Sequence, residues 1–230
     1  MKHKISVVIT VWNGANYLSE AIQSALDQDY LNKEIIVVND GSTDETLEVI
    51  SSFGEGIRVV NQENKGLGAA RNAGVRVAAG DYYAFLDHDD VWPKYKLSEQ
   101  MRVMMSHEED PLVFSYLQQF ICPRLTETEK KELRVNESIL PAYFASNLLI
   151  SKKRFEQIGF FMQENKVGEF VEWYARALRL SLPMVMSETI GLLRRVHKNN
   201  MGRQHDRYKQ SDYLKILKTH LTLKRSELNL

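Results

Sequence analysis

Two hydrophobic periods alternate along the first ninety residues. Short, β-branched apolar runs predict buried strands at Ile5–Val11, Ile35–Val38, Arg58–Asn61 and Tyr82–Leu86. Apolar residues at helical spacing predict helices between these strands, at Asn16–Asp27, Thr46–Phe53 and Gly68–Ala79. The alternation predicts the α/β class, with a mostly parallel central sheet flanked by helices on both faces.

After Pro93 the pattern is less regular. It predicts helices at Lys96–His107, Lys153–Ile158 and Glu169–Leu180, strands at Leu112–Phe120 and Phe144–Ile150, and a charged connection over Pro123–Glu137. A wide apolar stripe predicts a closing helix at Tyr208–Leu223. Because there is no linker or internal repeat, we expect one domain over residues 1–205, with functional halves at 1–95 and 96–205, followed by a basic amphipathic helix within 206–230.

The composition narrows the class of protein. Apolar residues make up 43% of the chain and charged residues 26%, which excludes collagen-like and wholly disordered chains. No run of about 18 apolar residues occurs, so no bilayer-spanning helix is expected, and the N-terminus lacks the features of a signal peptide. Cys122 is the only cysteine, so no internal disulfide can form and a reducing cytoplasm is the expected location.

The charges balance overall but are unevenly distributed. From Arg194 to the end there are 10 Lys and Arg residues against 3 Asp and Glu, a local balance of 10 − 3 = +7. This basic end could meet phosphate, an anionic membrane or an acidic partner, or be a solvated helix face. The closing helix could therefore lie on the inner face of the cytoplasmic membrane, or pack on the domain or on a second subunit as a homodimer.

In parallel sheets of this kind, ligands bind beyond the carboxyl ends of the strands. Thr10, Trp12 and Asn13 follow the first strand, where a ring and an amide could hold a flat base, although a core or surface Trp is the alternative. Asp40 ends the second strand and could accept a hydrogen bond from a ring N–H.

The fourth strand ends in Asp87-His88-Asp89-Asp90. Three carboxylates within four residues repel one another, and a divalent cation would offset that repulsion. Hard oxygen ligands suit Mg²⁺ or Mn²⁺, which bridge carboxylates to phosphate oxygens. A solvated turn is the alternative explanation.

The segment Asn64–Asn72 begins like a dinucleotide fingerprint. Arg71 stands where the third glycine should be, and the segment follows the third strand, so NAD binding is rejected. A glycine-rich helix start can still lie near a diphosphate, with Gly68 at the helix start and Arg71 supplying charge.

Taken together, VVITVWNG, EIIVVNDGSTDET, NKGLGAARNAG and GDYYAFLDHDD resemble the nucleotide-sugar-binding half of glycosyltransferase family 2 over Lys4–Lys96. SNLLISKKRFEQIGFF and LLRRVHKNN resemble the acceptor-side strand and helix and the late Arg-x-His segment, to about Asn200. The resemblance implies the GT-A fold, with a nucleotide-binding half followed by an acceptor-binding half. It also implies a nucleoside-diphosphate sugar donor, Mn²⁺ or Mg²⁺, and inversion at the anomeric carbon.

The resemblance assigns roles residue by residue. Trp12 would line the base pocket and Asp40 would read the base, which we expect to be uracil. The expected nucleotide-sugar-binding set is Thr10, Trp12, Asn13, Asp40, Gly68, Arg71, Asp87, His88 and Asp89. The expected metal ligands are Asp89, Asp87 and His197.

One position departs from the family pattern. The family has Glu-Asp before a helix with Trp and Arg, and that Asp is the expected base, but here Phe170 occupies its place. We expect Glu169 to act as the base, favoured by the helix dipole, and Glu172 to bind or orient the acceptor. A helix cap is the alternative role for Glu169.

The expected function is metal-dependent, inverting transfer of a sugar, from a UDP-sugar, to an acceptor hydroxyl. The acceptor would be a glycan or lipid-linked molecule in cell-envelope glycan, capsule or lipopolysaccharide synthesis, and no nucleic-acid partner is expected. One alternative is a sugar-phosphate nucleotidyltransferase, although WNGANYL lacks that class's triphosphate loop. A sugar-nucleotide-binding protein without turnover, suggested by Phe170, is the other.

Overall fold

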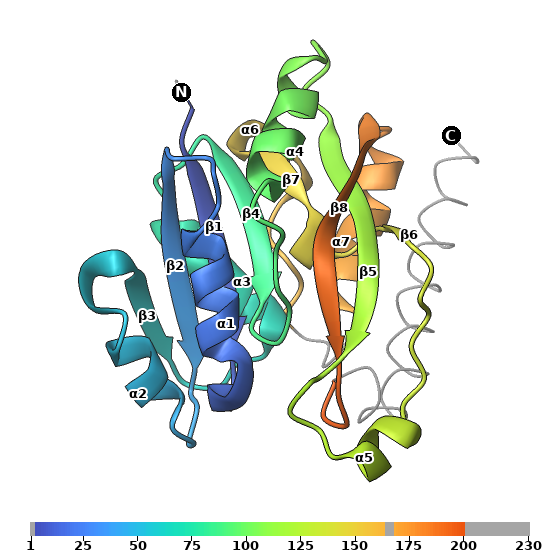
Figure 1. The fold of residues 1–230 in the computed structure, drawn as a ribbon. Coiled ribbons are helices and arrows are strands. Elements are labelled where there is room, and N and C mark those ends of the chain that lie inside the picture. The colour runs from blue at the N-terminus through green and yellow to red at the C-terminus, as the bar shows by residue number, and fades with distance from the viewer. Residues whose placement is uncertain (1–2, 164–167, 201–230) are drawn as a thin grey trace, which may run out of the picture.

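The computed structural model describes residues 3–163 and 168–200 (Figure 1). Every strand and helix predicted in the first ninety residues is present, with ends shifted by a few residues. The elements are β1 (Ile5–Val11), α1 (Ala15–Leu26), β2 (Lys33–Asp40), α2 (Thr46–Ser51), the short 3₁₀ helix η1 (Gly54–Gly56), β3 (Arg58–Gln62), α3 (Leu67–Val77) and β4 (Tyr82–Asp87).

The second half agrees less closely with the sequence-based prediction. Its elements are α4 (Lys96–Met105), β5 (Leu112–Ile121), α5 (Glu127–Lys131), β6 (Leu140–Ala142), the 3₁₀ turn η2 (Ala145–Asn147), β7 (Leu149–Ser151), α6 (Lys152–Ile158), α7 (Glu169–Arg179) and β8 (Met184–Val196). The single strand predicted at Phe144–Ile150 is wrong over its first part, which contains η2, and is confirmed only at its end, where β7 begins. The charged connection contains α5, and β8 was not predicted. The predicted closing helix lies outside the described residues.

One sheet runs through the described chain, in the order β3-β2-β1-β4-β7-β5-β6, with β8 beside β5. The strands β3, β2, β1 and β4 are parallel, β7 is antiparallel to both β4 and β5, β6 is antiparallel to β5, and β8 is parallel to β5. The carboxyl ends of β1, β2, β4, β5 and β8 therefore meet at one edge, which is the lower edge in Figure 1.

Helices cover both faces of the sheet because its central strands alternate their side chains between two apolar layers. Ile5, Val7 and Ile9 of β1 pack in one core cluster with residues of α1 and α4, whereas Val8 packs in the other with α3, α6 and α7. Gly74 lets α3 approach closely, since a Cβ there would lie 2.4 Å from Val8 Cγ1. Among the described residues, none of the helices is both long and apolar enough to cross a bilayer.

The first residue of α4 is a lysine whose side chain is buried in the core. Lys96 is fully buried, its Nζ donates to Gln100 Oε1 at 2.7 Å and lies 3.9 Å from the centroid of the Trp92 ring. Burial lowers the pKa of Lys96 well below its ordinary value, because a buried ammonium loses its hydration. The folded protein therefore binds this proton less tightly than the unfolded chain does.

This difference predicts a pH-dependent stability. Between the lowered folded pKa and the unfolded value, the unfolded chain holds the extra proton, so the free energy of unfolding rises with pH. Urea denaturation should show wild type gaining stability from pH 7 to pH 9.5 relative to Lys96→Met, by at most about 1.4 kcal/mol per pH unit. The exposed Lys94→Met is the control. Parallel stability curves for wild type and Lys96→Met would contradict the prediction.

Candidate functional site

The carboxyl edge of the sheet collects the residues that the sequence singled out. Thr10 lies near the end of β1, Asp40 ends β2, Asp87 ends β4, and His197 directly follows β8. Thr10 and Asp87 are direct partners in the pairing of β1 with β4. Strands from both halves of the chain therefore contribute to one site.

Asp40 is buried and its carboxylate is occupied by protein donors. Its Oδ1 accepts from Gln62 Nε2 at 2.6 Å and from the Lys65 amide at 2.9 Å, and its Oδ2 accepts from the Gly66 amide at 2.9 Å. A carboxylate offers about four acceptor positions, so roughly one stays open for a ligand. In this structure Asp40 holds the loop that leads into α3.

The tip of β1 carries an exposed ring. Trp12 is 53% exposed, so its face is accessible to a planar ligand. Asn13 adopts a left-handed backbone with φ 51°, its amide donates to Ser42 Oγ at 2.9 Å, and its Oδ1 accepts from the Thr43 amide at 2.7 Å. Asn13 thus fixes the loop after β2 beside Trp12. His88 packs nearby, since a Cβ on Gly14 would lie 2.3 Å from its Cδ2.

Arg71 links the two halves of the site. Its side chain is 3% exposed, Nη2 donates to Asp87 Oδ1 at 2.8 Å, and Nη1 donates to Glu169 Oε1 at 2.5 Å. Burial opposes the charge of Arg71, but the charges of Asp87 and Glu169 outweigh burial and raise its pKa above the ordinary value. Gly68, one turn earlier, lets α3 reach this position, since a Cβ there would lie 2.1 Å from the Met162 carbonyl oxygen.

Two buried side-chain polar atoms among the described residues have no hydrogen-bond partner, and both belong to predicted donor-binding residues. They are Thr10 Oγ1 and Arg71 Nε. Leaving a buried polar atom unpaired costs about 1–3 kcal/mol, so such atoms indicate a missing ligand or water. Their place at the carboxyl edge fits a polar ligand at this site.

The second oxygen of Asp87 has a partner that sequence reasoning missed. Ser146 Oγ donates to Asp87 Oδ2 at 2.6 Å, and Ser146 lies in η2, within the run predicted as strand. Its only signal in the sequence was a polar residue inside an apolar run.

Asp89 and His197 are adjacent, as the predicted metal set requires. His197 Nε2 lies 3.1 Å from Asp89 Oδ2, which also accepts from Asn200 Nδ2 at 3.1 Å. Burial alone would raise the pKa of Asp89, but the hydrogen bond with His197 and the charges of His88 and His197 lower it to about 2. Asn200 ends the segment LLRRVHKNN, three positions after His197, but nothing in the sequence indicated a role for it.

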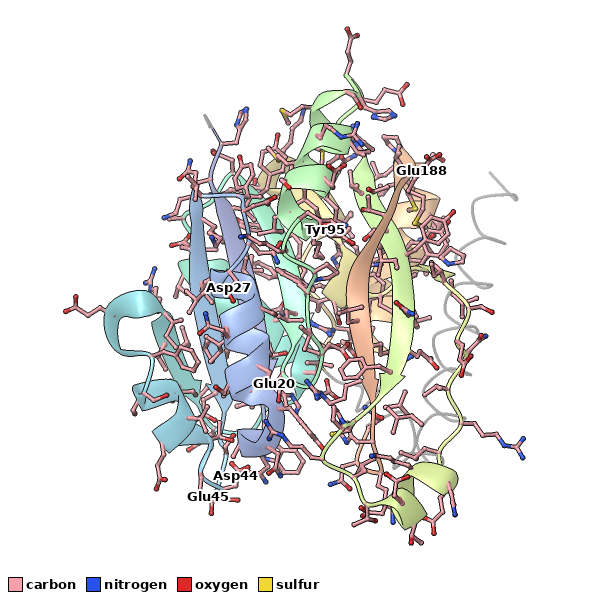
Figure 2. The ribbon with its side chains drawn as sticks, viewed as in Figure 1. Glu20, Asp27, Asp44, Glu45, Tyr95 and Glu188 are labelled. Carbon is pink, nitrogen blue, oxygen red and sulfur yellow. The ribbon has the colours of Figure 1, made fainter. Side chains whose placement is uncertain are left out.

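Arg195 fastens the end of β8 to the acidic turn. Its amide donates to Asp90 Oδ1 and its Nε donates to the Asp89 carbonyl, both at 2.9 Å. Its Nη2 pairs with Glu20 Oε2 at 2.5 Å, and Glu20, labelled on α1 in Figure 2, also pairs with Arg124 Nη2 at 2.5 Å. Burial, with the charges of Asp89 and Asp87, raises the pKa of Asp90 well above its ordinary value.

The predicted metal set is only partly assembled. Within residues 3–163 and 168–200, no group of three or more His, Cys, Asp or Glu side chains is arranged to hold a metal. Asp87 is engaged by Arg71 and Ser146, whereas Asp89 and His197 lie together. Mg²⁺ is usually held by one or two carboxylates plus substrate phosphates, and imidazole suits transition metals, so Asp89 and His197 fit an ion shared with a diphosphate.

The start of α7 holds the two candidate bases. Glu169 is 7% exposed and paired with Arg71, and Phe170 packs against Trp173 with ring centroids 5.7 Å apart. Glu172 is partly buried and pairs with Arg176 Nε at 3.0 Å, one turn further along the helix. Each of the two carboxylates of α7 is thus held by an arginine, but only Glu169 is connected to Asp87.

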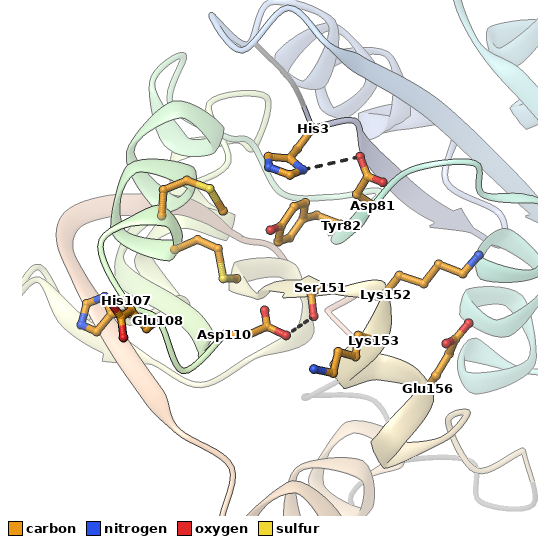
Figure 3. A pocket seen from close by; sticks show the side chains of 12 residues that line it. His3, Asp81, Tyr82, His107, Glu108, Asp110, Ser151, Lys152, Lys153 and Glu156 are labelled. Atoms are coloured by element: carbon orange, nitrogen blue, oxygen red, sulfur yellow. Dashed lines mark hydrogen bonds and ion pairs between the residues drawn. The ribbon is translucent and has the colours of Figure 1, made fainter.

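A separate cavity of about 590 Å³ lies at the opposite edge of the sheet (Figure 3). Its lining includes His3, Asp81, Tyr82, Asp110 and Ser151, and Ser151 Oγ donates to Asp110 Oδ2 at 2.7 Å. Tyr82 begins β4, whereas Asp87 ends it. This cavity is therefore separated from the candidate site by the length of the strand.

Comparisons with known proteins agree with this geometry. The family model described as Glycosyl transferase family 2 matches residues 6–170. An "Uncharacterized glycosyltransferase" of Rickettsia felis is 34% identical over 212 residues, which cover 84% of this chain and 34% of that protein. The "UDP-Glc:alpha-D-GlcNAc-diphosphoundecaprenol beta-1,3-glucosyltransferase WfaP" of Escherichia coli is 37% identical over 119 residues, 51% of this chain and 46% of that protein. The chain thus spans well under two thirds of the length of both relatives.

The fold itself has a solved counterpart. S. aureus TarS 1-349 in complex with UDP-GlcNAc matches with a TM-score of 0.67 and 20% identity, covering 86% of this chain and 60% of that chain. The expected GT-A arrangement, a central sheet flanked by helices, is confirmed. Because the family model matches well over half of the sequence, the chain belongs to glycosyl transferase family 2.

Proposed function

We propose that this chain transfers a sugar from a UDP-sugar to an acceptor hydroxyl, with the help of a divalent metal and with inversion at the anomeric carbon. The observation that carries the proposal is the pairing of Asp89 with His197 beside Asp87, at the carboxyl edge of the sheet. The exposed Trp12 ring and the buried Asp40 at the same edge support a base site. WfaP is named for UDP-Glc and TarS was solved with UDP-GlcNAc, which favours uracil as the base.

Asp89 and His197 are the residues that would hold Mn²⁺ or Mg²⁺, and Asp87 would contact the ion or the ribose. The bound ion supplies positive charge that stabilises the departing diphosphate. The side chains of the protein orient the donor. Trp12 would stack on the base, and Arg71 fixes the carboxylate of Asp87.

The acceptor is proposed to be a glycan or a lipid-linked sugar of the cell envelope, such as a capsule or lipopolysaccharide precursor. WfaP is named for a diphosphoundecaprenol-linked acceptor, which supports this class. An acceptor of that kind would place the protein at the cytoplasmic face of the membrane.

The proton of the acceptor needs a base on the face opposite the leaving group. Glu169 was the expected base, but accepting a proton would break its buried ion pair with Arg71. Glu172 is also paired with an arginine, Arg176, but that pair is less buried than the pair of Glu169 with Arg71, so losing it costs less. We therefore propose that Glu169 holds Arg71 and that Glu172 takes the proton.

A matched pair of substitutions separates the two roles. Glu172→Gln should lower turnover by about a hundredfold while UDP affinity and melting temperature stay at wild-type values. Glu169→Gln should lower the melting temperature and the UDP affinity together. Sugar transfer, UDP titration and thermal melting are measured on each variant. The opposite pattern would return the base role to Glu169.

The proposed function is tested by thermal shift with UDP-, GDP- and ADP-sugars, with Mn²⁺ and with EDTA. A ligand at a hundred times its Kd stabilises the native state by about 2.7 kcal/mol, so a UDP-sugar with Mn²⁺ should raise the melting temperature clearly. Equal shifts with all three nucleotides would contradict a uracil site. Binding without sugar transfer to any acceptor would favour a donor-binding protein without turnover.

A further inference from the structure

We infer that Ser146 is a positioning residue of the donor site, which sets the orientation of the Asp87 carboxylate from the acceptor half of the chain. The inference rests on the proposed function, because it takes Asp87 as a donor-binding group. Ser146 is 2% exposed, and its hydroxyl donates to Asp87 Oδ2 at 2.6 Å.

The two oxygens of Asp87 are fixed from two sides. Arg71 Nη2 donates to Oδ1 at 2.8 Å and Ser146 Oγ donates to Oδ2 at 2.6 Å. Rotation about the Cβ–Cγ bond moves both oxygens, so it breaks one hydrogen bond when one oxygen has a donor and two when both oxygens have donors. The pair of donors therefore fixes the direction of the remaining lone pairs of Asp87 toward the ligand.

Ser146 can act in this way because its own turn is held rigidly. Its carbonyl oxygen accepts from the Trp92 indole Nε1 at 2.9 Å, and Trp92 is buried. Asn147, the next residue, receives a hydrogen bond at Oδ1 from Ser115 Oγ at 2.5 Å and at its carbonyl from Gln100 Nε2 at 2.8 Å. A buried, satisfied network of this kind defines one geometry.

The same contact explains why polar residues interrupt an apolar run. A strand through Phe144–Ile150 would alternate its side chains between the two faces of the sheet. The 3₁₀ turn instead brings Ser146 to Asp87 and Asn147 to Ser115. The break in the strand thus adds a second connection between the two halves of the chain at Asp87, beside the one through Arg71 and Glu169.

The test uses two substitutions of the same shape. Thr and Val differ by one hydroxyl in place of a methyl group, so Ser146→Thr and Ser146→Val carry the same excess volume but only Thr can donate to Asp87. UDP affinity in the presence of Mn²⁺ is measured by calorimetry for both, for Ser146→Ala and for wild type, and thermal melting is measured for each. Ser187→Ala, a buried serine on β8 whose hydroxyl pairs with Thr189 Oγ1, is the control.

We expect Ser146→Ala and Ser146→Val to bind UDP about tenfold more weakly than wild type, Ser146→Thr to bind more tightly than Ser146→Val, and Ser187→Ala to bind as wild type does. Equal UDP affinities of the Thr and Val variants, or wild-type affinity in Ser146→Ala, would overturn the inference. If wild type itself does not bind UDP, the proposed function fails instead. If both larger variants unfold, Ser146→Ala against Ser187→Ala decides the question.

Discussion

Replacing Arg71 with Met is expected to lower the free energy of unfolding by about 3–5 kcal/mol, the cost of breaking a buried ion pair by removing one partner. Methionine fills much of the volume of the arginine stem but leaves the Glu169 carboxylate buried without its cation. Asp87 also loses the donor to its Oδ1 and keeps only the hydrogen bond from Ser146 to its Oδ2. Urea denaturation at pH 7 measures the change.

Arg76→Met is the matched control, because Arg76 lies on the same helix but is exposed and stacks on Phe160. We expect its effect on stability to stay within about 0.5 kcal/mol, as for most surface substitutions. A similar small loss in Arg71→Met would show that the ion pair of Arg71 with Glu169 does not hold the two halves of the site together.

Asp89→Asn should lower the Mn²⁺-dependent affinity for UDP by about a hundredfold, the upper end of what even outer residues of metal sites cost when they are replaced. Asparagine keeps the shape of Asp89 and can still accept from Asn200, so the fold should persist. What it removes is the negative charge that an ion beside His197 requires. Calorimetric titration of UDP with and without Mn²⁺ measures the effect.

Asp81→Asn is the control for this loss of charge, because Asp81 lies in the cavity at the opposite edge of the sheet. It should leave the Mn²⁺-dependent affinity at the wild-type value. Unchanged affinity in Asp89→Asn, with Mn²⁺ still required, would remove Asp89 from the metal site and leave His197 without its partner there.

The first ninety residues could be read from sequence because their signals are local. A run such as Ile5–Val11 is rich in β-branched apolar residues and is buried on both faces, as a central strand is, and helix-spaced apolar residues follow it. The rule that ligands lie at the carboxyl edge then placed Asp40, Asp87 and Asp89 in one region without any coordinates. The structure confirms that placement.

The second half could not be read in the same way, because contacts with distant residues determine its elements. β8 contains Gly191, a poor strand residue, which is required because a Cβ there would lie 2.0 Å from Ser115 Oγ. The strand predicted at Phe144–Ile150 gives way to η2, since Asp87 and Trp92 bond to Ser146. None of these partners is near in sequence, so no periodicity records them.

The alternation of strands and helices, the family and the acidic group at the end of β4 could all be recognised from the amino-acid sequence, since each depends on residue types at short spacing. Which charges meet depends instead on how the chain packs. Arg71 lies 98 positions before Glu169, and Asp89 lies 108 positions before His197. Packing of α3 against α7 and of β8 against the acidic turn brings these groups within hydrogen-bonding distance. Because the groups are buried, an unpaired charge among them would destabilise the folded state.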